Sequence, residues 1–384
     1  MRVYLDNAAT TRPYNEVIDI INEYNTEYYG NASSLHSFGR EARKGIEWAR
    51  EEIANLINAS AREILFTSGA TESDNWAIRG AAYHNIEKGK HIITSAIEHH
   101  AVLHTCKQLE KEGFEVTYLP VDSEGNINLR DLKDAIREDT TLISIMAANN
   151  EIGTIEPIKE IGEIARKKGI LFHTDAVQAI GKMDIDVEKM NIDMLSMSAH
   201  KIHGPKGIGF LYINKKVRID VFMQGGGQER ALRAGTYNAP CIAGMGKAVE
   251  ITKANMEKNI PYMKELRDYF IDEILKDVPD TILNGSREKR LCNNINFTFK
   301  GIEGEALLYA LDLKGIACST GSACTADSGS ESHVIDALGD NNKFEIGASV
   351  RFSLSEFNTK EEVNYTIAVL KDTINKLRKL SPFY

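Results

Sequence analysis

The stretch Ser196-Met-Ser-Ala-His-Lys201-Ile-His-Gly-Pro-Lys-Gly-Ile-Gly209 indicates the fold, because it sets a lysine just past an apolar, strand-like run. Upstream, His173-Thr-Asp175-Ala-Val-Gln178 sets a carboxylate at the end of the preceding strand-like run. In sheets of parallel strands, ligands bind beyond the carboxyl ends of the strands. We therefore expect Lys201 and Asp175 to lie at one edge of a sheet and to face a common ligand.

Short apolar, β-branched runs recur along the first half of the chain and alternate with helix-like segments. The strand-like runs are 63–67, 91–95, 115–119, 142–146, 170–174, 193–197 and 207–213. Helix-like segments lie between most of them, among them 71–84, 101–111, 129–136 and 157–167. Strands that alternate with helices predict an α/β fold, with a mainly parallel seven-stranded sheet covered on both faces.

A second, smaller α+β region is predicted in the C-terminal part of the chain. It follows a glycine-rich turn at 224–230 and a long helical stretch at about 240–275. Its last helix opens with Thr359-Lys-Glu-Glu362, which has the spacing of a capping box. We expect a large domain over 13–255 and a small domain made of 1–12 and 256–384, which carries a cysteine-containing loop at about 318–332.

The composition permits many functions and excludes few. Of the 384 residues, 42% are hydrophobic and 26% are charged, which suits two domains with sizeable cores. The net charge of −9 argues against nucleic acid as a direct partner. The first residues contain no apolar signal-peptide core, and no apolar run is long enough to span a membrane. Five cysteines, odd in number and without a CxxC pair, indicate free thiols in a reducing cytoplasm.

Lys201 and Asp175 together have the chemistry of a pyridoxal 5′-phosphate (PLP) site. Such a site needs an amine for a Schiff base and an anion that keeps the pyridine nitrogen protonated. Gln178 lies three residues after Asp175 and is placed to donate to the phenolic oxygen of that cofactor. Each residue alone has a plainer explanation, since an isolated lysine is usually exposed and an aspartate after a strand is often a helix cap. Their pairing favours the cofactor.

Other polar residues that follow predicted strands, among them Glu98-His99 and Asn149-Asn150-Glu151, are expected to converge on the same pocket. In Ser68-Gly-Ala70-Thr71, the first backbone N–H groups of a helix and the Thr71 hydroxyl can bind an anion. Ser198 and His200 can join them in a phosphate cup, and His99 can stack on an aromatic cofactor. An ordinary capped helix explains Ser68–Thr71 equally well.

Arg351 and Cys324 are candidates whose alternatives stay open. Arg351 lies in a strand-like run of the small domain and can clamp a substrate carboxylate or form a structural ion pair. Cys324 lies in a Ser-, Thr- and Gly-rich run, where it is either an incidental thiol or a nucleophile on a mobile arm. A metal site of Cys318, Cys324 and His333 fits no tight zinc spacing, so we expect no metal.

In this order, the motifs resemble those of cysteine desulfurases of the NifS/IscS group, within the fold type I, class V aminotransferase-like PLP enzymes. The resemblance runs nearly end to end. It includes Leu5-Asp-Asn-Ala-Ala-Thr-Thr11, Gly30-Asn-Ala-Ser-Ser-Leu-His36, Thr67-Ser-Gly-Ala-Thr-Glu-Ser-Asp-Asn75, Ala148-Asn-Asn-Glu-Ile-Gly-Thr154, Gly225-Gly-Gly-Gln-Glu-Arg230, Arg233-Ala-Gly-Thr236, Ser319-Thr-Gly-Ser-Ala-Cys324 and Arg351-Phe-Ser-Leu354. Each motif alone is moderately specific, and together they are highly specific.

The resemblance implies roles for the candidate residues. For PLP it implies Lys201 as the Schiff-base lysine, Asp175 at the pyridine nitrogen, Gln178 at the phenolic oxygen and His99 in stacking and proton transfer. Around the phosphate it implies Ala70, Thr71, Ser198, His200 and, across a homodimer interface, Thr236. For the substrate carboxylate it implies Asn150 and Arg351. Cys324 is implied as the cysteine that forms a persulfide.

The implied reaction converts L-cysteine to L-alanine and moves the sulfur to Cys324, then to a sulfur acceptor or iron–sulfur scaffold protein. Iron–sulfur cluster assembly and other sulfur-cofactor pathways both use such a donor. The alternatives are another fold type I activity, such as an aminotransferase or selenocysteine lyase, and a sulfur-relay protein without catalysis. The chain departs from its relatives at Ala231 and Ala234, where they usually carry glycine and serine, and at 328–333, where a proline is lost.

Overall fold

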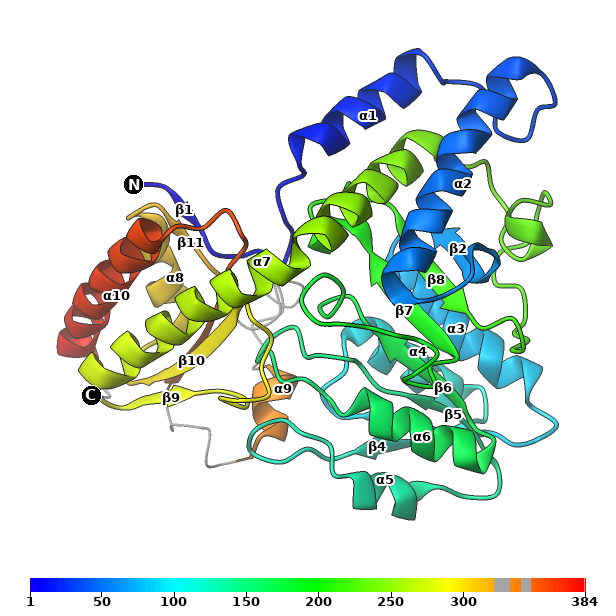
Figure 1. Ribbon diagram of the computed structural model, residues 1–384. Coiled ribbons are helices and arrows are strands. Elements are labelled where there is room, and N and C mark those ends of the chain that lie inside the picture. Colours follow the sequence, from blue (N-terminus) through cyan, green and yellow to red (C-terminus); the bar gives the residue numbers. More distant parts are fainter. Residues whose placement is uncertain (321–331, 340–346, 383) are drawn as a thin grey trace.

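A computed structural model describes residues 1–320, 332–339, 347–382 and 384 (Figure 1). Its largest sheet has seven strands: β2 (Ile64–Thr67), β3 (His91–Ser95), β4 (Glu115–Leu119), β5 (Thr140–Ser144), β6 (Leu171–Asp175), β7 (Met194–Ser198) and β8 (Gly209–Ile213). Their spatial order is β2-β8-β7-β6-β5-β3-β4. Only β8 runs antiparallel to its neighbours in this sheet, which confirms the predicted mainly parallel α/β fold.

Helices cover both faces of this sheet, so successive residues along a strand pack in different hydrophobic cores. Ile92, Leu142 and Met194 pack with α3 (Ala70–His84) and α4 (His100–Lys111). The next residue along each of these strands packs in the opposite core. That core also receives α1 (Asn15–Thr26), α2 (Ser37–Ile57), α5 (Leu129–Ala135) and α6 (Ile158–Lys168). Burial on both faces explains why the strands are continuous apolar runs instead of alternating ones.

A separate core lies in the C-terminal part of the chain. Strands β9 (Thr281–Leu283), β10 (Asn294–Lys300) and β12 (Gly347–Ser353) form an antiparallel sheet in the order β12-β10-β9. The N-terminal strand β1 (Val3–Tyr4) pairs in parallel with β11 (Ile316–Ala317). The helices of this region are α8 (Gly304–Asp312), α9 (His333–Ala337) and α10 (Lys360–Leu380). The predicted capping box at Thr359 and Glu362 is present at the start of α10.

The long helix α7 (Ala239–Asp277) connects the two parts of the molecule (Figure 1). Its first half packs in the core of the large sheet, and Leu266, Phe270 and Ile274 pack in the C-terminal core together with Val3 and Leu5. These separate cores support the proposed division into a domain over 13–255 and a domain made of 1–12 and 256–384. In the part of the chain that the structure describes, no helix is both long and apolar enough to cross a membrane.

Candidate active site

A cavity of about 490 Å³ lies at the carboxyl edge of the large sheet. Strands β2, β6 and β7 all end at this edge, because two antiparallel pairings through β8 leave β2 parallel to β7. Ten of the predicted site residues line the cavity: Ala70, Thr71, His99, Asn150, Asp175, Gln178, Ser198, His200, Lys201 and Arg351. The structure therefore brings the predicted residues at the ends of these strands together in one cavity.

Not every polar residue after a strand reaches the cavity. Glu98 was expected to converge there with His99, and this expectation was wrong. Its carboxylate is fully buried, where Oε1 accepts hydrogen bonds from the Ser95 hydroxyl at 2.6 Å and from the Met146 N–H at 3.0 Å. Burial raises the pKa of Glu98 to about 8. Asn149 and Glu151, next to Asn150, likewise do not line the cavity.

Lys201 and Asp175 enter the cavity from neighbouring elements. Lys201 ends the short 3₁₀ helix η2 (Ala199–Lys201), directly after β7, and its Nζ donates to the carbonyls of Ala8 at 2.6 Å and Ala9 at 2.7 Å. Asp175 ends β6, and its Oδ1 accepts from the Val177 N–H at 2.9 Å. Burial raises the pKa of Asp175 to about 6, although the Val177 hydrogen bond and the Lys201 charge oppose this shift. A partner cation would favour its ionised form.

An anion cradle lies at the start of α3. The helix begins after Gly69, which has a φ of 155° that side-chain-bearing residues rarely adopt, and no side chain of the described residues caps its first turn. Glu72 stands in this first turn, but its carboxylate is neutralised by Arg233 through contacts of 2.8 and 3.0 Å. The positive end of α3 and the Thr71 hydroxyl therefore face the cavity without a net opposing charge nearby.

His99 lies at the N-cap of α4 and is neutral. Its Nδ1 accepts from the Ala101 N–H at 3.1 Å, so the neutral ring carries its proton on Nε2. Burial, helped by the Lys201 charge, lowers the pKa of His99 to about 4. The neighbouring His100 is half-buried. Its ring packs between those of His104 and His333, with centroids 4.9 and 4.7 Å away.

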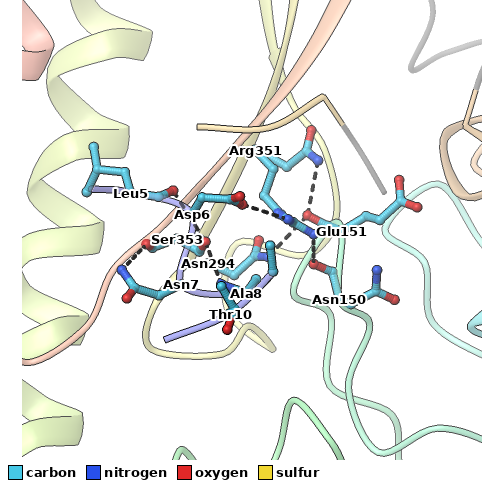
Figure 2. Close-up of polar contacts among 12 residues, drawn as sticks. Leu5, Asp6, Asn7, Ala8, Thr10, Asn150, Glu151, Asn294, Arg351 and Ser353 are labelled. Carbon is cyan, nitrogen blue, oxygen red and sulfur yellow. Dashed lines mark hydrogen bonds and ion pairs between the residues drawn. The ribbon is translucent and has the colours of Figure 1, made fainter. Parts of the chain in front are cut away.

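Arg351 lines the cavity and also forms the ion pair that was one of its two alternatives (Figure 2). Its guanidinium lines the cavity and is only 2% exposed. It also forms an ion pair, since Nη2 lies 3.0 Å from Oδ1 of Asp6, and Nη1 donates to the Asn150 carbonyl at 3.0 Å. The ion pair thus stands at the cavity wall, where Arg351 can still meet a ligand.

Thr236 and Cys324 are the two remaining predicted residues. Thr236 is exposed and does not line the cavity. Cys324 lies outside the described residues, within 321–331. Sequence reasoning assigned no role to the N-terminal segment, although Ala8, Ala9 and Thr10 form part of the cavity wall. The motif at 5–11 was the sequence feature that could have indicated such a role. The residues with which it forms hydrogen bonds at the cavity lie nearly two hundred residues or more away in the chain.

A family model for aminotransferase class-V matches residues 3–366. The chain belongs to the aminotransferase class-V family. A cysteine desulfurase IscS of Methanosarcina thermophila is 54% identical over 380 residues, which cover 99% of this chain and 94% of that protein. Among solved structures, a NifS-like protein has a TM-score of 0.91 and 41% identity, covering 98% of this chain and all of that one. The structure titled SspA in complex with cysteine has a TM-score of 0.80 and 37% identity, covering 93% and 100%.

Class V enzymes of this kind depend on PLP, and the cavity residues fit that cofactor. The volume suits a small organic phosphate. An amine and a carboxylate stand at one side, in Lys201 and Asp175, while the positive end of α3 offers a phosphate site. A Cβ on Gly69 would make an ordinary contact with Oγ of Ser198 at 3.6 Å, so the φ of 155°, not a lack of space, favours glycine in this cradle. Family membership confirms the predicted resemblance.

Proposed function

We propose that this class V enzyme is a PLP-dependent cysteine desulfurase that converts L-cysteine to L-alanine and transfers the sulfur to Cys324. The observation that carries the proposal is the meeting of Lys201, Asp175 and Arg351 in one cavity, in a chain about half identical to cysteine desulfurases along its whole length. A cation for an α-carboxylate beside a PLP site defines an amino-acid enzyme.

Lys201, Asp175, Gln178 and His99 hold the PLP ring in this proposal, and Ala70, Thr71, Ser198 and His200 hold its phosphate. When bound, PLP supplies an electron sink for the carbon skeleton of the amino acid. Asp175, buried at the end of β6, stabilises a positive charge on the ring nitrogen. Gln178 is oriented by donating to the Ala8 carbonyl at 3.0 Å.

His99 moves protons in this proposal. Because its Nδ1 accepts from the Ala101 N–H, only Nε2 is left to exchange a proton with a ligand. The lowered pKa keeps the ring neutral at physiological pH, so Nε2–H donates a hydrogen bond to the ligand. When the ring proton shifts to Nδ1 and the Ala101 hydrogen bond opens, Nε2 can take a proton from the ligand, which forms imidazolium, and give it back. The Lys201 charge disfavours imidazolium, which returns the ring to its neutral form after each transfer.

Arg351 and Asn150 bind the substrate α-carboxylate, and Cys324 takes the sulfur. The Cys324 thiolate attacks the sulfur of L-cysteine, so a sulfur–sulfur bond forms as the carbon–sulfur bond breaks. The electron pair of the broken bond stays with the carbon skeleton, which gains a proton and leaves as L-alanine. The resulting persulfide is passed to an acceptor protein for iron–sulfur cluster or other sulfur-cofactor synthesis.

The assembly that we propose is a cytoplasmic homodimer. Thr236 is exposed and away from the cavity of its own chain, which supports a contact with the phosphate site of a second copy. The four cysteines among the described residues are all free, in keeping with a reducing compartment.

The test is to identify the products that the PLP-loaded protein makes from L-cysteine in the presence of a thiol reductant. We expect alanine and sulfide in equal amounts. Cys324→Ala should keep the visible absorbance of bound PLP and lose sulfide release, because the cofactor site is intact and the sulfur has no acceptor thiol. Formation of a keto acid instead, or sustained alanine production by Cys324→Ala, would refute the assignment.

A further inference from the structure

The N-terminal segment Leu5–Thr11 has no part in the proposed chemistry, yet it contacts several cavity residues. The Ala8 carbonyl accepts from both Lys201 Nζ and Gln178 Nε2, and the Ala9 carbonyl accepts from Lys201. The Thr11 hydroxyl donates to the His200 carbonyl at 2.9 Å. These contacts place the segment along the cavity wall. The side chain of Asp6, in the same segment, reaches Arg351.

Asp6 and Asn150 hold the Arg351 guanidinium from two sides (Figure 2). Asp6 Oδ1 lies 3.0 Å from Nη2, and the Asn150 carbonyl accepts from Nη1 at 3.0 Å. Two anchors on different nitrogens fix both the position and the plane of a guanidinium. Five N–H donors are available to arginine, so these two contacts leave others for a ligand. In the described part of the chain, Nε has no hydrogen-bond partner.

Asp6 is itself held in a rigid position. Its carbonyl accepts from the Ala9 N–H at 3.0 Å and from the Tyr4 hydroxyl at 3.2 Å. It also forms a β-bridge with Ser353, two residues beyond Arg351 on β12. The carboxylate and the guanidinium are therefore fixed to the same piece of backbone, which limits the orientations that either side chain can take.

We propose that Asp6 is a positioning residue, which orients Arg351 for the α-carboxylate of an amino-acid ligand. The proposal rests on the proposed function only in assigning that carboxylate to Arg351. A guanidinium that is 2% exposed needs a compensating charge when no ligand is bound, and Asp6 supplies one from the rim, where its own side chain is 20% exposed. Without Asp6, the guanidinium loses one of its two anchors and turns away from the ligand position.

The experiment compares ligands with and without a carboxylate on the PLP-loaded protein. L-alanine and ethylamine differ only in this group, and their binding is measured by calorimetry. For Asp6→Ala we expect the Kd of L-alanine to rise about tenfold, the scale of one lost charge-assisted hydrogen bond, while that of ethylamine stays constant. Asp6→Asn, which keeps an acceptor oxygen, should recover most of the affinity. Tyr4→Phe is the matched control, because it removes a hydrogen bond to the Asp6 carbonyl but leaves the Asp6 carboxylate on Arg351. Its Kd for L-alanine should therefore change far less than that of Asp6→Ala.

Two results would overturn the proposal. Equal weakening of both ligands, together with lost PLP absorbance, would make Asp6 a structural residue only. Tighter binding of L-alanine by Asp6→Ala would show that Asp6 competes with the ligand for Arg351. Neither readout depends on desulfuration. If the protein makes no alanine from L-cysteine but Asp6→Ala still discriminates the two ligands, the proposed function fails and the role of Asp6 stands.

Discussion

At the residue scale, the buried carboxyl of Glu98 should make stability depend on pH. The folded state raises its pKa to about 8 by burial, whereas an unfolded glutamate titrates near about 4.3. The folded state therefore binds a proton that the unfolded state has already lost, and stability falls as pH rises through this window. The loss is about 1.4 kcal/mol for each pH unit. Glu98→Gln removes this dependence and can keep both hydrogen bonds to Oε1.

Urea unfolding of the wild type and Glu98→Gln between pH 5 and pH 7.5 measures this contribution. For each unit by which the pH rises, the free energy of unfolding of Glu98→Gln should increase by about 1.4 kcal/mol relative to that of the wild type. Glu163→Gln, on the exposed side of α6, is the control and should follow the wild type at every pH. A pH-independent difference between Glu98→Gln and the wild type would contradict the expected titration.

Individual residues also show how much of the site can be predicted from the sequence. Asp175, Ser198 and Lys201 were identifiable because each follows an apolar strand, and parallel strands bring such positions to one edge. Glu98 follows the same rule and fails, since its carboxylate turns into the interior toward Ser95. Asp6 could not be predicted to meet Arg351, because the two are 345 residues apart and their contact depends on the folded backbone.

At the element scale, the short 3₁₀ helix η3 (Glu229–Ala231) holds three consecutive residues at positive φ, of 43°, 58° and 63°. Buried Arg50 fixes the first through contacts of 2.8 and 3.0 Å to the Glu229 carboxylate. Ala231 has the largest positive φ of the three, and a side-chain-bearing residue costs about 1 kcal/mol there relative to glycine. Ala231→Gly should therefore raise the free energy of unfolding by up to about 1 kcal/mol, less the greater chain entropy of glycine.

Chemical denaturation with Ala234→Gly as the control tests this expectation. Ala234 belongs to the same segment, is buried, and does not have a positive φ. Its replacement should lower the free energy of unfolding by about 0.5–1 kcal/mol or somewhat more, because glycine adds chain entropy there and removes a buried methyl group. Destabilisation by both variants would show that the backbone at Ala231 is not strained.

At the scale of the whole molecule, the elements were more predictable than their arrangement. Continuous apolar runs identified the seven strands, and the capping box located the start of α10. The insertion of β8 between β2 and β7 depends on pairings such as Ile64 with Tyr212, which no local pattern encodes. Local sequence patterns do not encode a contact with a second copy of the chain either. For Thr236, this contact was expected because of the family resemblance.

The proposed sharing of Thr236 between two copies can be tested by complementation. Lys201→Ala should lack covalent PLP and turnover, and Thr236→Ala should retain PLP poorly at limiting cofactor. If Thr236 serves the partner site, a mixed dimer of these chains has one complete site, formed by Lys201 of one copy and Thr236 of the other. Purified through two different tags, it should reach about half of the wild-type activity, since one site of two is intact in a symmetric dimer. If Thr236 serves its own cavity, neither site is complete, and the mixed dimer will be no more active than Thr236→Ala alone.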